Sequence, residues 1–243
     1  LGGVLSQFKS SSNQQNFTYQ PQSGVLLSAT EGDVKSEFDY FPSGVLQQES
    51  MTEQGNTVSS GSYLYTMSGL IQRHTDSFGQ HHDYIYDDNG KLIESIQGDQ
   101  RAGYKYNALG QLITTVTYDE RAGLQLETQL TYDDFGREIS RVVTSESSVH
   151  TTELTYTTDN QIKQSVTTVD GFVVLHESYS YDKTKRLSQY QCEGNQSPVT
   201  ESGRTLCQQT YQYDQWGNIV QLDNEYIDGA ETFTYQFSDL DPT

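Results

Sequence analysis

The sequence predicts an all-β chain of tandem hairpins that pair into one continuous, curved antiparallel sheet. Pairs of large apolar residues two positions apart recur along the chain, and most pairs are followed four residues later by glycine. Alternation with a period of two is typical of a half-buried strand, and glycine is typical of a tight turn. No segment shows the i, i+3, i+4, i+7 apolar pattern of an amphipathic helix. We therefore expect almost no helix.

The strand pattern is anchored by tyrosine. The second residue of each pair is a tyrosine, and these ruler tyrosines recur with a mean spacing of about 24 residues. They are Tyr19, Tyr40, Tyr65, Tyr86, Tyr106, Tyr132, Tyr156, Tyr181, Tyr213 and Tyr235. Two residues earlier stand Phe17, Phe38, Tyr63, Tyr84, Tyr104, Leu130, Leu154, Tyr179, Tyr211 and Phe233. Successive strand residues alternate sides, so both side chains of a pair are expected on one face.

A turn is predicted after each ruler tyrosine. Four residues beyond it stand Gly44, Gly69, Gly90, Gly110, Gly136 and Gly217, with Asn160 and Lys185 in two further units. Gly and Asn tolerate the positive φ that such turns require. Directly after the tyrosine come Asp87, Asn107, Asp133, Asp182 and Asp214, whose side chains can accept hydrogen bonds from the turn backbone. The unit is therefore strand, turn, strand.

The second strand of each hairpin is expected to begin with an aliphatic residue two positions past the glycine. The residues there are Leu46, Ile71, Leu92, Leu112, Ile162, Leu187 and Ile219. In the unit of Tyr132 this position holds Glu138, and the aliphatic residue is Ile139. One extra residue would reverse the faces of the strand, so we expect a compensating β-bulge in this unit.

Composition favours a thin, half-hydrated sheet. Only 33% of residues are hydrophobic, yet the chain holds 18 tyrosines and one tryptophan. Tyrosine packs its ring while its hydroxyl stays hydrogen-bonded, which suits such a layer. The net charge of −19 disfavours binding to nucleic acid, and no apolar run is long enough to span a bilayer. The acidic residues are spread along the chain, which is typical of a solvated surface; a site for a cationic partner is the alternative.

The phrases YDDNGKL, YNALGQL, YDDFGRE and YDQWGNI resemble the YD repeat, or Rhs repeat. This repeat occurs in bacterial Rhs proteins, in teneurins and in the B and C components of Tc insecticidal toxin complexes. The segment from RLSQYQCEGN to FTYQFSDLDPT is most similar to the Tc shell components. The resemblance covers about ten hairpin units, from Phe17 to Phe237, so residues 1–243 are expected to form a single array. Because the chain begins at Leu1, we expect it to be a fragment of a larger protein.

The resemblance implies a spiral shell wall that encloses a toxin polypeptide in a secreted bacterial toxin. The implied partners are the rest of the parent shell and its cargo. Sheet edges at the two ends of the fragment also make edge-to-edge self-association an expectation. The alternative is an adhesion module on the same repeats, in which the rings recognise carbohydrate or a cell surface. A third reading, an enzyme with an unrecognised pair of carboxylates, is disfavoured.

No catalytic, cofactor or metal site is expected. His74, His81 and His82 are close in sequence but lack a metal-binding motif, and His150 and His176 are isolated. Asp87, Asn89 and Gly90 resemble the middle of an EF-hand loop, but Ile85 and Ile96 stand where its first and last ligands belong. Some members of the family carry an aspartyl self-cleavage site; the SDLDPT phrase with Asp239 and Asp241 lacks its glycine context, so that activity is not expected here.

The two cysteines leave one question open. Cys192 and Cys207 are too few for a disulfide scaffold, and no CxxC pattern indicates zinc. They either close one local loop or remain two free thiols.

Overall fold

The computed structural model describes residues 6–9 and 14–237, and this part of the chain contains strands and no helix. The fold is all-β and antiparallel, which confirms the fold class expected from the sequence. No helix in the described residues is long and apolar enough to cross a bilayer. The strands divide between two compact units, Leu1–Tyr104 with Thr117–Gly123, and Lys105–Val116 with Leu124–Thr243.

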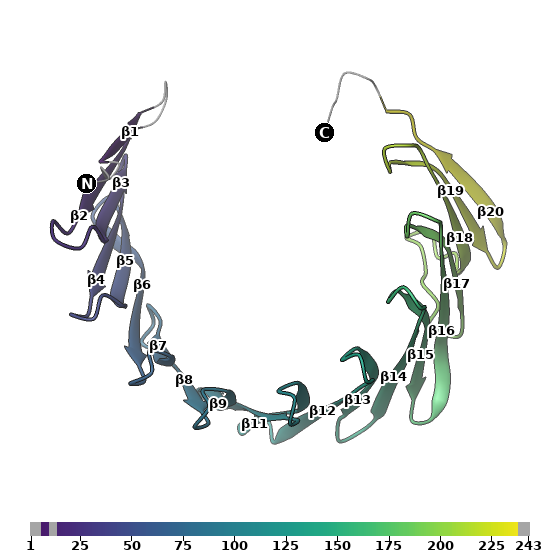
Figure 1. Cartoon of the computed structure of the whole chain (residues 1–243), viewed down its shortest axis with the longest axis horizontal. Coiled ribbons are helices and arrows are strands. Elements are labelled where there is room, and N and C mark those ends of the chain that lie inside the picture. The colour runs from purple at the N-terminus through teal and green to yellow at the C-terminus, as the bar shows by residue number, and fades with distance from the viewer. Residues whose placement is uncertain (1–5, 10–13, 238–243) are drawn as a thin grey trace. The chain divides into compact units, whose positions relative to one another are not determined.

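The first unit is a ladder in which each strand pairs antiparallel with its neighbours in sequence (Figure 1). Its strands are β1 (Gln7–Lys9), β2 (Gln14–Tyr19), β3 (Leu26–Glu31), β4 (Val34–Tyr40), β5 (Leu46–Glu53), β6 (Asn56–Tyr65), β7 (Ile71–Thr75), β8 (His81–Tyr86), β9 (Leu92–Gln97) and β10 (Gln100–Tyr106). Lys105 and Tyr106 at the end of β10 belong to the second unit, and the residues of β11 (Leu112–Asp119) are divided between the two units.

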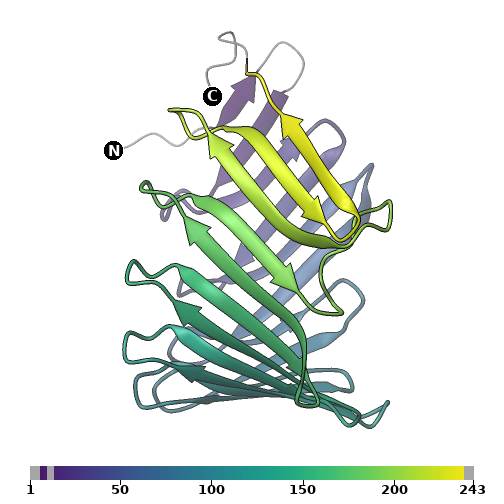
Figure 2. The ribbon, with the colours of Figure 1, turned by 90° about the vertical axis from the view of Figure 1, so that its right-hand side faces the viewer.

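The second unit is built in the same way, and Figure 2 shows its successive hairpins in green to yellow. Its strands are β12 (Leu124–Tyr132), β13 (Glu138–Thr144), β14 (Val149–Tyr156), β15 (Ile162–Val169), β16 (Phe172–Tyr181), β17 (Leu187–Glu193), β18 (Leu206–Tyr213), β19 (Ile219–Tyr226) and β20 (Gly229–Thr234).

The ruler tyrosines mark strand ends. Each even-numbered strand from β2 to β18 ends at one of them, whereas β20 ends one residue before Tyr235. The rings of a pair share a face, as expected: half-buried Tyr179 and Tyr181 flank exposed Ser180. The following strand begins at the expected position in every regular unit, six residues after the tyrosine.

A register shift precedes the ruler tyrosine in every unit whose hairpin register is described. In the unit of Tyr156, for example, Thr155 pairs with Gln164 but Tyr156 pairs with Ile162. The unit of Tyr132 has the same shift, because Tyr132 pairs with Glu138. The bulge expected in this unit is therefore confirmed, but it is not specific to the unit: every unit with a described hairpin register has it, and Glu138 occupies the aliphatic position.

The hydrophobic core is thin. Among the described residues, the buried hydrophobic side chains are Val174, Tyr190, Cys192, Leu206 and Tyr226. Four of them form one cluster in the second unit, with half-buried Leu175, Tyr179, Leu187 and Tyr211 packed against it. Most apolar side chains are thus partly hydrated, so backbone pairing and side-chain hydrogen bonds must carry much of the stability.

The turn positions supply a direct test of backbone strain. The eight residues four positions after a ruler tyrosine, from Gly44 to Gly217, all have φ between +64° and +95°. Lys185 adopts φ +69° despite its side chain, whereas Gly69 adopts φ +84° with no atom near the place where a Cβ would stand. Side chains in this region cost about 1 kcal/mol or more.

We predict that Lys185→Gly raises the free energy of unfolding by about 0.5–1 kcal/mol and that Gly69→Lys lowers it by about 1 kcal/mol. The substitutions are reciprocal and both sites are turns. The ion pair of Lys185 with Asp159 is exposed, so its loss costs little. Urea denaturation followed by circular dichroism measures both effects. The two changes in stability should have opposite signs; a loss of stability on Lys185→Gly would contradict the strain argument.

Candidate functional site

The ruler tyrosines connect neighbouring hairpins through their hydroxyls. In five units the hydroxyl donates to the backbone carbonyl oxygen of the first residue of the preceding strand, a contact that we call the tyrosine clamp. The five clamps, with O–O distances, are Tyr86 to Ile71 (2.7 Å), Tyr132 to Leu112 (2.7 Å), Tyr156 to Glu138 (2.5 Å), Tyr181 to Ile162 (2.8 Å) and Tyr213 to Leu187 (2.7 Å).

The clamps lie where backbone pairing between hairpins has stopped. The pairing of β15 with β16 ends at Gln164 and Ser178, and that of β17 with β18 ends at Gln189 and Thr210. Beyond these pairs the strands continue to the turn edge without ladder partners on that side. The clamp supplies a donor to a carbonyl that the ladder does not reach, and a buried carbonyl without a donor would destabilise the sheet.

Burial favours the protonated form of four clamp hydroxyls. It raises the pKa of Tyr181, and it is the largest cause of the raised pKa values of Tyr86, Tyr156 and Tyr213. Only the neutral phenol can donate a hydrogen bond. The same partial burial that packs the ring therefore preserves the donor.

An acidic or amide side chain closes several of the turns from within. Asp87 Oδ1 accepts hydrogen bonds from the backbone N–H groups of Asn89 and Lys91, at 2.9 and 2.8 Å. The same double contact is made by Asn107, Asp133, Asp182 and Asp214. One further turn of this kind, between β7 and β8, was not predicted from the sequence; it is closed by Asp76. Asp87 thus acts within its own turn, and this contact disfavours the EF-hand alternative.

A second set of contacts runs along the turn edge of the second unit. The residue after the turn position, which is Gly, Asn160 or Lys185, reaches the turn of the next hairpin, and we call this set of contacts the turn-edge ladder. Its four bonds are Gln111 to Gly136 O (3.3 Å), Arg137 to Asn160 Oδ1 (2.8 Å), Gln161 to Lys185 O (2.7 Å) and Arg186 to Asp214 O (3.2 Å). Sequence reasoning missed these contacts, although a polar residue follows the turn position in all four units.

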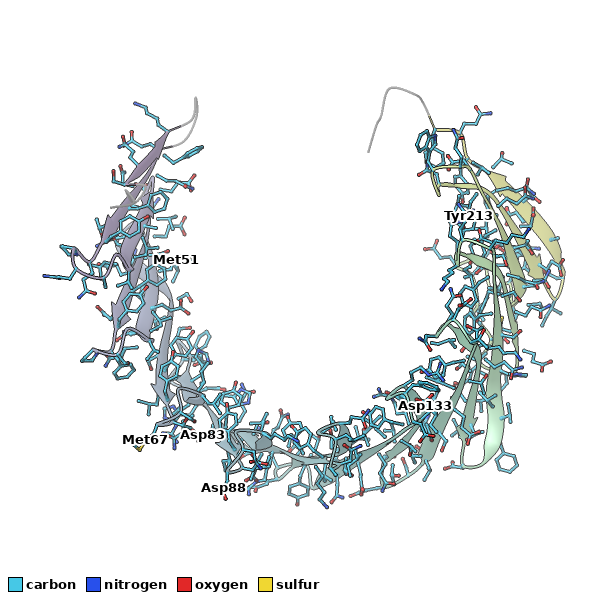
Figure 3. All side chains as sticks on the ribbon, viewed as in Figure 1. Met51, Met67, Asp83, Asp88, Asp133 and Tyr213 are labelled. Atoms are coloured by element: carbon cyan, nitrogen blue, oxygen red, sulfur yellow. The ribbon has the colours of Figure 1, made fainter. Side chains whose placement is uncertain are left out.

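Two arginines of this ladder also cover tyrosine rings. The guanidinium of Arg137 lies 4.5 Å from the ring centroid of Tyr156, and that of Arg186 lies 4.4 Å from that of Tyr213. Figure 3 labels Asp133 and Tyr213 at this edge. Arg137 is held in turn by the carboxylate of Asp133, whose pKa is lowered by hydrogen bonds from Arg137 despite the opposing effect of desolvation. Cation, carboxylate and ring thus fix the spacing of adjacent turns.

In the first unit an apolar residue, Leu70, stands at the ladder position. It lines an open recess of about 790 Å³ with Tyr84, Tyr86, Asp87 and Gly90. Met67 and Asp88, both labelled in Figure 3, lie at its rim, and Met67 is fully exposed. The recess thus lies where an apolar residue replaces the polar residue of the ladder position.

Two histidines, which pair across β7 and β8, pack against tyrosine rings. His74 lies 5.0 Å from the ring of Tyr63, and His82 stacks on Tyr84 at 4.4 Å. His176 Nδ1 lies 3.0 Å from Glu193 Oε1. Within the described ranges no group of three His, Cys, Asp or Glu side chains could hold a metal ion. Asp239 and Asp241 lie outside the described residues.

One tyrosine of the first unit is bonded to a carboxylate. The hydroxyl of Tyr63 donates to Glu49 Oε1 at 2.7 Å, and this bond, with burial, raises the pKa of Tyr63 to about 12. In the second unit burial raises the pKa of Tyr179 to about 12, with Glu177 adding to the effect. Both groups therefore couple stability to alkaline pH.

Comparison with solved structures shows the fold of the chain. The crystal structure of TcdB2-TccC3-TEV matches with a TM-score of 0.74 and 14% identity, over 93% of this chain and 13% of the other. The crystal structure of TcdB2-TccC3 without the hypervariable C-terminal region matches with a TM-score of 0.67 and 15% identity, over 93% and 15%. The chain thus spans less than a sixth of either protein. No family model and no curated protein sequence matches it.

We predict that Tyr181→Phe lowers the free energy of unfolding by about 1 kcal/mol, because the carbonyl of Ile162 loses its donor while the ring is retained. Urea denaturation at neutral pH measures the change. Tyr118→Phe is the matched control, since that ring is exposed and belongs to no clamp. Equal stability of the two variants would show that the clamp hydroxyl contributes nothing.

We also predict that the protein loses stability between about pH 10 and pH 12. Phenols in unfolded chains titrate near pH 10, whereas Tyr63 and Tyr179 hold their protons to about pH 12 when folded. Their contribution is complete below about pH 10 and disappears as the pH rises through the folded pKa. Urea midpoints across this range, with tyrosinate absorbance, measure it. Constant midpoints together with a single tyrosinate transition near pH 10 would contradict this.

In fold, then, this chain is a tandem β-hairpin array like that of the TcdB2-TccC3 structures.

Proposed function

We propose that this segment is a stretch of wall in a hairpin-repeat shell that encloses a toxin polypeptide, in an exported, Tc-like bacterial toxin component. The two matched structures are of TcdB2-TccC3, and their fold extends over 93% of this chain. At such low sequence identity a structural match shows the fold alone. The role is therefore inferred from the contacts that the repeat residues make in this chain.

The observation that carries the proposal is that the polar groups of the repeat act between and within hairpins. Tyrosine hydroxyls bridge neighbouring strands, and aspartate oxygens close turns. Turn arginines and glutamines bind the next turn. A wall needs such lateral contacts, whereas a catalytic site needs polar groups that converge on a substrate.

The repeat tyrosines and turn glycines are therefore assigned structural roles, in one array across residues 1–243 of a larger protein. The segment itself is proposed to be non-enzymatic and to use no cofactor. Its partners are the adjoining repeats of the parent shell and the enclosed polypeptide. Enclosure works by excluding proteases and other proteins from the interior, so few contacts with cargo are required.

Edge-to-edge association follows from the last strand. In the described residues β20 pairs with β19 alone, and the rings of Phe233 and Tyr235 are exposed by 37% and 44%. Strand edges with exposed rings favour pairing with another strand. In the parent protein a strand of the adjoining repeat pairs with this edge.

Limited proteolysis of the parent protein that contains this segment tests enclosure. Its toxin polypeptide should be cleaved at least tenfold more slowly than the same polypeptide expressed alone. A tenfold decrease in cleavage rate corresponds to about 1.4 kcal/mol of protection. The double variant Tyr181→Phe and Tyr213→Phe should lose part of this protection, while Tyr118→Phe should retain it. Cleavage at the rate of the free polypeptide in all three proteins would refute enclosure.

The adhesion alternative has a separate test. Half-buried rings with engaged hydroxyls are poorly placed to stack on sugars, so binding of the 243-residue chain to a glycan array should not exceed background. Binding that Trp216→Ala abolishes would favour adhesion, because the Trp216 side chain is 82% exposed at a turn tip.

A further inference from the structure

Two cysteines face each other across neighbouring strands of the second unit. The register of β17 with β18 pairs Gln189 with Thr210, Tyr190 with Gln209 and Gln191 with Gln208. One residue further along this register sets Cys192 opposite Cys207. Directly opposed residues in antiparallel strands have Cβ atoms about 4.5–5.5 Å apart, close to the roughly 3.5–4.5 Å of a disulfide. The geometry points to Cys192 and Cys207 as a site of reversible disulfide formation.

Side-chain contacts agree with this placement. Cys192 Sγ donates to the carbonyl oxygen of Leu206, the residue next to Cys207, at 3.2 Å. Both cysteines line the same recess of about 320 Å³, and both are free thiols in the structure. The remaining residues that line the recess are His176, Glu177, Ser178, Gln191 and Glu193.

Local backbone irregularity gives Cys207 room to adjust. The pairing of β18 with β19 shifts between Leu206 and Gln208, so Cys207 is the unpaired residue of a bulge. A bulged residue can move without breaking ladder hydrogen bonds on that side. A disulfide requires the two Cβ atoms to move slightly closer together. The backbone at Cys207 can make this movement because it is the bulged position of the strand.

The two thiols differ in access. Cys192 is 6% exposed and belongs to the buried cluster with Tyr190, Leu206 and Tyr226, and burial raises the pKa of its thiol. Cys207 is half-buried. An external reagent therefore meets Cys207 first, and Cys192 acts as the resolving thiol.

The oxidant in this scheme is a small-molecule disulfide, such as oxidised glutathione. The Cys207 thiolate attacks one sulfur of the reagent, forms a mixed disulfide and releases one reduced thiol. The Cys192 thiolate then attacks the Cys207 sulfur and releases the second reduced thiol. Two protein thiols are oxidised, one reagent disulfide is reduced to two thiols, and the two protons pass to these products.

The cross-link would close the connection between β17 and β18. This connection is tightly docked: Gln196 N–H donates to the carbonyl oxygen of Val174, and a Cβ at Gly194 would lie 2.2 Å from that oxygen. Val199 and Thr205 form a short bridge within it. A disulfide across its base restricts the unfolded chain and stabilises this hairpin.

Equilibration of the 243-residue chain with oxidised glutathione, followed by intact-mass analysis after alkylation, tests the proposal. The expected product has lost two hydrogens, takes up no alkylating reagent and yields a peptide that joins Cys192 to Cys207. Its melting temperature should exceed that of the reduced chain by about 5 °C. Two alkylated thiols, two glutathione adducts or a disulfide-linked dimer would each overturn the proposal.

Single variants separate the roles of the two thiols. Cys192→Ser should hold one glutathione on Cys207, because the resolving thiol is absent. Cys207→Ser should leave the buried Cys192 unmodified under the same conditions. Rapid modification of Cys192 in Cys207→Ser would overturn the assigned order of attack, and the intact-mass result on the unaltered chain stands independently of how well either variant folds.

Discussion

The constraint on which the structure depends is the need to satisfy backbone groups in a sheet that has almost no dry core. Strand pairing between hairpins stops short of the turn edge, and the bulge before each ruler tyrosine interrupts the ladder within the hairpin. The tyrosine clamp supplies the missing donor while its ring packs on the half-buried face. One residue type thus satisfies a carbonyl and shields it from water, which explains why tyrosine, rather than phenylalanine, recurs there.

The turn edge extends this principle from one hairpin to the next. Aspartate orders several turns internally, and in the second unit the arginine or glutamine after the turn position binds the following turn. These contacts are local along the array, as expected for a repeat protein whose units contact only their neighbours. Such a construction transmits order laterally without requiring a central core. The same property suits a wall of extended area better than a compact domain with a pocket.

The variations between units are informative because the frame is constant. Glu138 replaces an aliphatic residue and binds Arg141 instead, with no change in register. Lys185 replaces the turn glycine and accepts a positive φ. Leu70 replaces the polar ladder residue and leaves an open recess. Each exception changes a side-chain contact while the backbone repeat persists, so the backbone geometry is the part of the motif under the strongest physical constraint.

Sequence alone determined the strand ends, the turn positions and the shared face of each ring pair, because these follow from local rules: alternation along a strand and the φ that a turn residue must adopt. Aspartate within its own turn was likewise predictable, since its partners lie two and four residues away. The universal bulge, the clamps and the turn-edge ladder required the tertiary structure. The clamps and the turn-edge ladder join residues about 15 to 28 positions apart. Which carbonyl lacks a ladder partner depends on how far neighbouring strands stay paired, and this is a property of the assembled sheet rather than of any one hairpin.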